Sequence, residues 1–181
     1  QLGCSPWMTK KRKNTCMRKS YVAQTPEDFQ SLKSITSVSG LEYMRGMLNG
    51  AYAAPPISQT MNYCLIEVEK GKVVFRGRPT FNALNPMGAV HGGWYGTVLD
   101  SAMACAVSTR VPKEFMSTTL EYKINITRPI PMNMDVDIIG ISDHAGRSTG
   151  VASAKIIGSK NRKLYATGST TCFVFRVPPK F

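Results

Sequence analysis

The sequence lacks several features that mark common catalytic and membrane-bound classes of protein. It has two histidines, His91 and His144, and neither has a cysteine or an acidic residue at the spacing of a zinc site. No GxGxxG sequence occurs, which argues against a dinucleotide site. No apolar run approaches the roughly 18 residues needed to span a membrane. We therefore expect no metal, no cofactor and no membrane partner.

A disulfide framework is also missing. The five cysteines form no CxxC pair, and three of them, Cys64, Cys105 and Cys172, lie within apolar runs. This usage is typical of reduced thiols, so we expect a cytoplasmic protein rather than a secreted disulfide scaffold.

Acidic residues are absent from the first twenty positions, which contain six lysines and arginines of a chain whose net charge is +12. Residues 1–38 are polar and weakly patterned, so we predict a basic, flexible tail there and a single domain over residues 39–177. A basic run can bind nucleic acid or an anionic membrane. This run has no interleaved aromatic side chains on which bases could stack. We therefore interpret it as a solvated tail and expect no nucleic-acid partner.

The hydrophobic pattern predicts two helices and six strands. Residues 40–50 have the spacing of an amphipathic helix, and residues 94–109 form an apolar helix-like run. Strand-like segments are expected over 61–70, 72–78, 119–127, 134–142, 147–157 and 163–177. Because the turns between the last four strands are short, those strands must pair antiparallel. The second helix is apolar on nearly all sides and should be buried. We predict an α+β fold in which an antiparallel β-sheet wraps around a long central helix.

The segment Asn85-Pro86-Met87-Gly88-Ala89-Val90-His91-Gly92-Gly93 is a tight turn directly before the long helix. A helix start has unpaired N–H groups and a partial positive charge, and glycine lets a ligand oxygen approach the backbone. Asp100 is the one ionisable residue in the apolar run that follows, where burial without a partner is costly. The segment thus offers an oxyanion-binding helix start and a candidate catalytic carboxylate. From position alone, Asp100 could instead be a helix N-cap.

The pattern N-x5-HGG-x6-D, with Arg128-Pro129 closing the next strand, resembles the phenylacetyl-CoA-type (PaaI-like) acyl-CoA thioesterases of the hotdog fold. The resemblance covers residues 58–175. It implies a hotdog domain that forms homodimers, often assembled into tetramers, and that hydrolyses acyl-CoA thioesters without a metal.

The resemblance also implies roles for individual residues. Asp100 matches the catalytic carboxylate, and Gly92 matches the backbone donor to the thioester carbonyl. His91 and Asn85 match the polar residues that bracket the site. Thr119 matches a hydroxyl residue that helps to hold the water.

Two of these assignments leave alternatives open. Thr118 competes with Thr119, because the chain has one extra residue before this strand compared with some relatives. By the period-two alternation, Thr119 lies on the polar face of its strand and Thr118 on the face of Leu120. Asp100 can act as a general base or attack the thioester directly.

Substrate contacts are expected from Gly93, Trp94 and Arg128. Basic residues that could bind the phosphates of coenzyme A are Arg128, Arg147, Lys160, Arg162 and Lys163.

Two other functions fit a chain of this kind. One is a non-catalytic hotdog protein that binds acyl-CoA or a related thioester. The other is a hotdog dehydratase, but such enzymes usually place a histidine and an acid in another arrangement. The retained Asp100 favours hydrolysis.

Overall fold

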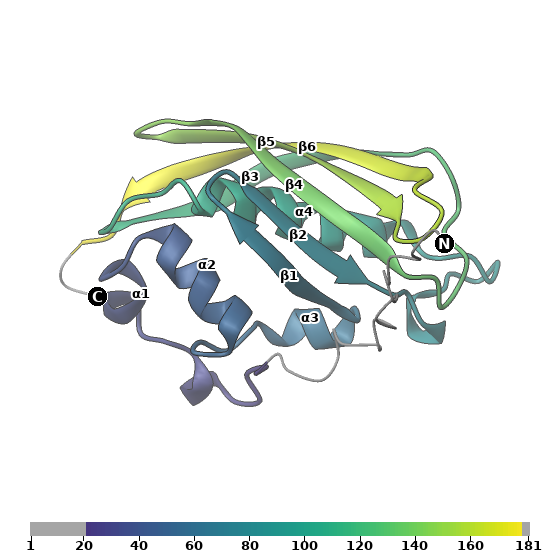
Figure 1. The fold of residues 1–181 in the computed structure, drawn as a ribbon, viewed down its shortest axis with the longest axis horizontal. Helices are drawn as coiled ribbons and strands as arrows, with labels where there is room; N and C mark the ends of the chain where they lie inside the picture. Colours follow the sequence, from purple (N-terminus) through teal and green to yellow (C-terminus); the bar gives the residue numbers. More distant parts are fainter. Residues whose placement is uncertain (1–20, 179–181) are drawn as a thin grey trace, which may run out of the picture.

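A six-stranded antiparallel sheet curves around one long helix in the computed structural model, which describes residues 21–178 (Figure 1). The helix is α4 (Gly92–Ser108), and the strand order in the sheet is β1-β2-β4-β5-β6-β3. Strands β1 and β3 are therefore the two edges. The predicted antiparallel sheet around a long central helix is confirmed.

All six predicted strands are present. Their bounds are β1 (Tyr63–Glu69), β2 (Lys72–Gly77), β3 (Phe115–Ile126), β4 (Val136–Ala145), β5 (Thr149–Gly158) and β6 (Leu164–Arg176). The largest difference is at β3, which begins at Phe115 rather than at Thr119. Its first residues pair with the end of the long strand β6, where Phe115 lies opposite Arg176.

Helix α4 is buried because its residues are apolar on almost every side, as the sequence predicts. Val98, Leu99, Ala102 and Met103 are all shielded from solvent. The helix also lies very close to the sheet: a Cβ atom at Gly140 of β4 would be 2.1 Å from the carbonyl oxygen of Ala102. No side chain fits in that gap, so glycine fixes the depth at which α4 sits in the curve of the sheet.

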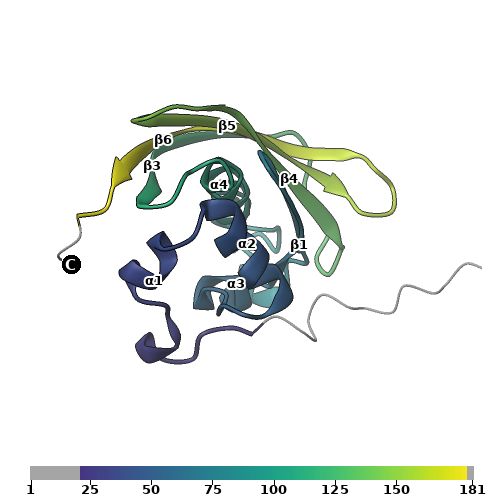
Figure 2. The ribbon, with the colours of Figure 1, turned by 60° about the vertical axis from the view of Figure 1, so that its left-hand side comes forward.

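Short helices cover the side of α4 that faces away from the sheet (Figures 1 and 2). They are η2 (Pro26–Asp28), α1 (Leu32–Thr36), α2 (Gly40–Asn49) and α3 (Pro56–Thr60), while η3 (Phe81–Ala83) precedes α4. The predicted helix over 40–50 corresponds to α2. It begins with a capping box between Ser39 and Glu42 and ends at Gly50, whose φ of 82° is left-handed.

Part of the predicted N-terminal tail is structured. Residues 1–20 lie outside the described residues. Residues 21–38 contain η2 and α1, and Val22 forms a parallel bridge with Ala54. Helix α3 begins at Pro56, directly after Pro55. Proline is well suited to the first position of a helix, because its fixed φ is helical and its missing N–H would have no partner there.

The cysteines differ in state. Cys105 and Cys172 are free thiols, but Cys64 is disulfide-bonded, so the expectation of reduced cysteines is wrong at that position. Burial, with the charge of Asp100 nearby, raises the pKa of the Cys105 thiol to about 12. That thiol is therefore protonated at neutral pH and a poor nucleophile.

The loop after β3 is tied to α4 by Tyr95. This buried hydroxyl accepts a hydrogen bond of 2.8 Å from the backbone N–H of Ile130, which is also buried.

We expect Tyr95→Phe to lower the free energy of unfolding by about 1–3 kcal/mol, because it leaves a buried donor without a partner. Denaturant unfolding measures this change. Tyr122→Phe is the control, since Tyr122 is half-exposed and its hydroxyl has no hydrogen bond within residues 21–178. Equal unfolding midpoints for wild type and Tyr95→Phe would refute the anchoring role.

Candidate active site

The start of α4 leaves one backbone donor unused. The N–H of His91 donates to the carbonyl oxygen of Ala83, and the N–H of Trp94 donates to that of His91. The N–H of Gly93 donates to Nδ1 of the His91 side chain at 2.8 Å. Within residues 21–178, the exposed Gly92 N–H has no acceptor. A ligand oxygen can therefore bind Gly92 at the positive end of the helix dipole, whereas the Gly93 donor is already occupied.

His91 caps the helix through its side chain. Because Nδ1 accepts the Gly93 N–H, a neutral His91 carries its proton on Nε2. The ring is exposed, so this second nitrogen can donate to a bound molecule.

Asn85 shapes the loop that leads to the helix. Its Oδ1 accepts from the backbone N–H groups of Met87 at 2.9 Å and Ala89 at 3.1 Å. Its own N–H donates to the carbonyl oxygen of Ala89 at 2.8 Å. The side-chain oxygen is thus used for loop geometry, which leaves the amide Nδ2 as the group that can face a ligand.

Asp100 lies in the middle of α4, so it is not a helix N-cap. Its Oδ1 accepts a hydrogen bond of 2.8 Å from the hydroxyl of Thr119 on β3. Thr118 is exposed and pairs with Phe173 of β6. The geometry therefore brings Thr119, and not Thr118, to the carboxylate.

A β-bulge explains why simple alternation misplaces Thr119. The register of β3 shifts between Thr119, opposite Cys172, and Glu121, opposite Thr171. Leu120 is the extra residue, and it is 63% exposed. Thr119 and Tyr122 consequently both face α4, although residues three apart in a regular strand lie on opposite faces. The prediction from period-two alternation that Thr119 lies on the polar face of its strand is therefore wrong.

Trp94 is placed in the core. Its indole N–H donates to the carbonyl oxygen of Met61 at 2.8 Å, and the buried ring packs edge-on against Tyr95. These contacts give Trp94 a structural function. Its side chain is buried and therefore offers no exposed surface for the expected substrate contact.

Arg128 lies beside the start of α4. It is exposed and has no ion pair within residues 21–178. A shallow hollow of about 270 Å³ here is lined by Val90, Tyr95, Ile126, Thr127, Arg128 and Pro129. The guanidinium is therefore available to an anionic ligand.

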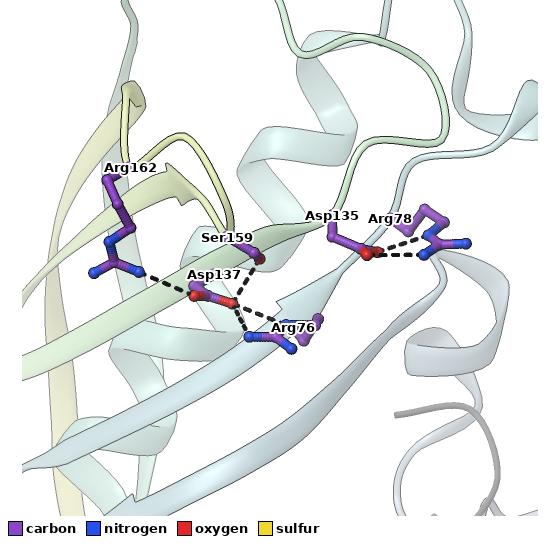
Figure 3. Close-up of polar contacts among 6 residues, drawn as sticks. All are labelled: Arg76, Arg78, Asp135, Asp137, Ser159 and Arg162. Carbon is purple, nitrogen blue, oxygen red and sulfur yellow. Dashed lines mark hydrogen bonds and ion pairs between the residues drawn. The ribbon is translucent and has the colours of Figure 1, made fainter. Parts of the chain in front are cut away.

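Arg162 is engaged elsewhere (Figure 3). The buried carboxylate of Asp137 accepts from Nε and Nη2 of Arg76 at 2.9 and 2.7 Å, and from the Ser159 hydroxyl at 2.8 Å. Arg162 completes this set through Nη1 at 3.3 Å. The cluster ties the turn between β5 and β6 to strands β2 and β4, so Arg162 has a structural role there.

A second ion pair lies next to this cluster. Arg78 binds both oxygens of Asp135 at 2.7 and 2.8 Å, and this contact holds the pKa of Asp135 below its usual value (Figure 3). Arg147, Lys160 and Lys163 are exposed and form no ion pair within the described part of the chain. They stay candidates for phosphate contacts.

The chain contains one G-x-S-x-G sequence, Gly146-Arg147-Ser148-Thr149-Gly150. In serine hydrolases this motif forms a sharp turn from a strand into a helix. Here it connects β4 to β5 in a hairpin, and Gly146 donates to the carbonyl oxygen of Thr149. The sequence is thus not a nucleophile elbow.

Within residues 21–178, no group of three or more histidine, cysteine or acidic side chains is arranged to hold a metal ion. No helix in this range has the length and hydropathy to cross a membrane.

Solved structures of thioesterases share this fold. The PaaI protein of the phenylacetic acid degradation operon of E. coli is 20% identical, with a TM-score of 0.61 over 68% of this chain and 85% of that one. A hypothetical thioesterase with coenzyme A from Streptococcus pneumoniae TIGR4 is 26% identical, with a TM-score of 0.60 over 66% and 91%. The protein smu.793 from Streptococcus mutans UA159, bound to acetyl CoA, is 25% identical, with a TM-score of 0.58 over 64% and 90%.

A family model also matches the chain, although no curated protein sequence does. The matched residues, 87–165, include the helix start, Asp100 and Thr119, and the model is that of the thioesterase superfamily. The match makes residues 87–165 similar to the thioesterase superfamily, and the solved structures show that the chain has the PaaI-like hotdog fold.

Proposed function

We propose that the protein hydrolyses acyl-CoA thioesters to a free acid and coenzyme A, with Asp100 as the catalytic carboxylate. The observation that carries the proposal is the 2.8 Å hydrogen bond from Thr119 to Asp100, on the same helix as the unpaired Gly92 N–H. Two similar proteins are known with acetyl CoA or coenzyme A bound, which supports the substrate class. The cytoplasmic location stays a prediction.

The chemistry needs an oxyanion donor and a base. The Gly92 N–H, strengthened by the helix dipole, stabilises the negative charge that develops on the thioester oxygen. Asp100 removes a proton from water while the water oxygen attacks the carbonyl carbon; the C–S bond then breaks and coenzyme A leaves as a thiolate. In the other route, Asp100 attacks the carbonyl, and water hydrolyses the resulting anhydride. Thr119 occupies Oδ1, so Oδ2 remains for either step.

The proposed sites are shared between two subunits. Gly92 and Asp100 are eight residues apart on one helix, which is a rise of about 12 Å and a rotation of about 80° beyond two full turns. One thioester carbon cannot contact both groups of one chain. A two-fold axis brings Gly92 of one subunit to Asp100 of the other and creates two equivalent sites.

Edge strand β3 supports such a dimer. Leu120, Tyr122 and Ile126 are 63%, 46% and 47% exposed on this strand, which has no neighbour on its outer side among residues 21–178. An open edge with apolar side chains tends to pair with another chain. Ile126 also lies 3.8 Å from the position of a Cβ atom on Gly92, so the edge adjoins the helix start.

We expect Asp100→Asn to lower kcat by roughly 10²-fold or more, because it removes the base or nucleophile and preserves size. The amide oxygen of asparagine can still accept from Thr119, so the fold should persist. The measurement is thiol release from short, medium, long and aromatic acyl-CoAs. A near-normal rate would refute the assignment of Asp100. Tight binding by the wild type without turnover of any substrate would favour the non-catalytic acyl-CoA-binding alternative.

Thr119 and Thr118 form a matched pair for testing the hydroxyl. Thr119→Val removes a hydrogen bond to a charged group, and we expect kcat to fall about tenfold or more. Thr119→Ser should restore most of the rate, and Thr118→Val should leave it within about twofold, since Thr118 faces away from Asp100. If both valine variants lose the same activity, the contact has no special role.

Mixed dimers test the shared site. Gly92→Pro removes the proposed donor at the first helical position, where proline is tolerated, and the extended backbone of His91 suits a residue before proline. Gly92→Pro and Asp100→Asn homodimers should both be inactive. After subunit exchange, a mixed dimer has one site with both lesions and one with neither, so about half the wild-type activity per dimer should return. Mixed dimers that form and stay inactive would exclude the shared site.

A further inference from the structure

A buried cysteine lies directly across the sheet from Thr119. Strands β3 and β6 lie side by side over α4 (Figure 2), and in their register Thr119 is paired with Cys172. Side chains directly opposite each other in an antiparallel pair have Cβ atoms about 4.5–5.5 Å apart. Cys172 is a free thiol and is 0% exposed. Its sulfur is therefore packed beside the hydroxyl that donates to Asp100 at 2.8 Å.

The Cys172 thiol keeps its proton at neutral pH. Burial raises its pKa, and hydrogen bonding with the hydroxyls of Thr119 and Thr170 opposes this rise. The negative charges of Asp100 and Glu121 raise the pKa further. A protonated thiol is a weak hydrogen-bond donor, and buried polar groups are normally paired. The S–H therefore has the two neighbouring threonine hydroxyls as candidate acceptors.

Thr119 is the better acceptor of the two. It faces Cys172 directly, whereas Thr170 is two residues away on the same strand, a separation of about 6.7 Å along β6. The Thr170 hydroxyl donates to a neutral group, the carbonyl oxygen of Glu121, at 2.6 Å. The Thr119 hydroxyl donates to a carboxylate, and hydrogen bonds arranged in a chain polarise one another. A donor behind Thr119 thus strengthens the bond to Asp100.

We propose that Cys172 is a positioning residue for the reaction: its S–H donates to Oγ1 of Thr119 and so directs the Thr119 hydroxyl at Oδ1 of Asp100. The inference rests on the proposed hydrolysis, because Asp100 is the reacting carboxylate only in that mechanism. With Oδ1 held in this way, Oδ2 keeps a fixed direction toward the water or the thioester carbon. Cys172 itself is buried and contacts no substrate.

Cys105 is the matched control for this thiol. It is also a free cysteine near the Asp100 charge, and burial raises its pKa to about 12. Within residues 21–178, no hydrogen bond ties this thiol to Asp100 or Thr119. Replacing either cysteine by alanine therefore removes a thiol near Asp100, but only Cys172→Ala removes a donor to Thr119.

We expect Cys172→Ala to lower kcat for acyl-CoA hydrolysis about three- to tenfold, the loss of one weak hydrogen bond, with KM within about twofold. The acid limb of the kcat–pH profile should move to higher pH, because a hydrogen bond to a carboxylate favours its charged form and the variant weakens that bond. Cys172→Ser keeps a donor and should restore both the rate and the profile. Cys105→Ala should retain the wild-type profile.

A double-mutant cycle with Thr119→Val distinguishes positioning from packing. If Cys172 acts through Thr119, Cys172→Ala should cause no further loss of kcat in the Thr119→Val background. Equal losses in both backgrounds, or an unmoved acid limb in Cys172→Ala, would overturn the positioning role. The same shift of the acid limb in Cys105→Ala would also overturn it, since that variant removes no donor to Thr119.

Infrared spectroscopy of the S–H stretch tests the contact without turnover. The difference between wild type and Cys172→Ala assigns the band, and Cys172→Ser serves if the alanine variant does not fold. A hydrogen bond lowers the S–H stretching frequency, so Thr119→Val should raise it, while Thr170→Val should leave it in place. A band that stays in place in Thr119→Val, or that moves equally in both variants, excludes Thr119 as the specific acceptor.

The infrared band and the turnover assay separate this inference from the proposed function. If no thioester is hydrolysed but the band moves in Thr119→Val, the contact between Cys172 and Thr119 stands and the proposed hydrolysis fails. If Asp100→Asn abolishes hydrolysis but the band stays in place in Thr119→Val, the hydrolysis stands and the positioning role fails. Absence of both turnover and a band shift overturns both.

Discussion

The close contact between α4 and the sheet is the constraint on which the site depends. At Gly140 the backbones of strand and helix approach so closely that a Cβ atom would overlap the carbonyl of Ala102. The buried side chains on the rest of α4 then fix its rotation. Asp100, two residues before Ala102, is thereby turned toward β3 and away from the interior, where its charge would be costly. Packing alone thus sets the direction of the carboxylate.

The bulge in β3 brings the hydroxyl of Thr119 into contact with the Asp100 carboxylate. Without an extra residue at Leu120, Thr119 and Tyr122 would lie on opposite faces of the strand. With it, Tyr122 packs near Gly96 while Thr119 reaches Asp100. A single backbone irregularity therefore combines sheet packing with a hydrogen bond to the only acidic residue of α4.

The sequence predicted the elements well and the irregularities poorly. The period-two alternation located the strands and the apolar run located α4. Both patterns reflect which residues are buried, so they can be read from the order of apolar residues. The bulge was invisible, since Leu120 fits a regular alternation and only its pairing with β6 reveals the extra residue. The HGG motif correctly indicated a helix start, but only the hydrogen bond from Gly93 to His91 shows which glycine N–H is left for a ligand. The ion pair of Arg162 with Asp137 is likewise absent from any sequence pattern, because the two residues are 25 positions apart in the chain.

In the proposed mechanism, the distance along α4 between Gly92 and Asp100 makes activity depend on formation of the dimer. The donor and the carboxylate of one chain are about 12 Å apart, so a monomer contains both groups yet completes no site. The open edge of β3 adjoins Gly92 through Ile126, so contacts that would stabilise a dimer lie beside the groups that complete the reaction centre. Dilution below the dimer dissociation constant would then remove activity without unfolding either subunit. Stability of the assembly and catalysis would then depend on the same strand.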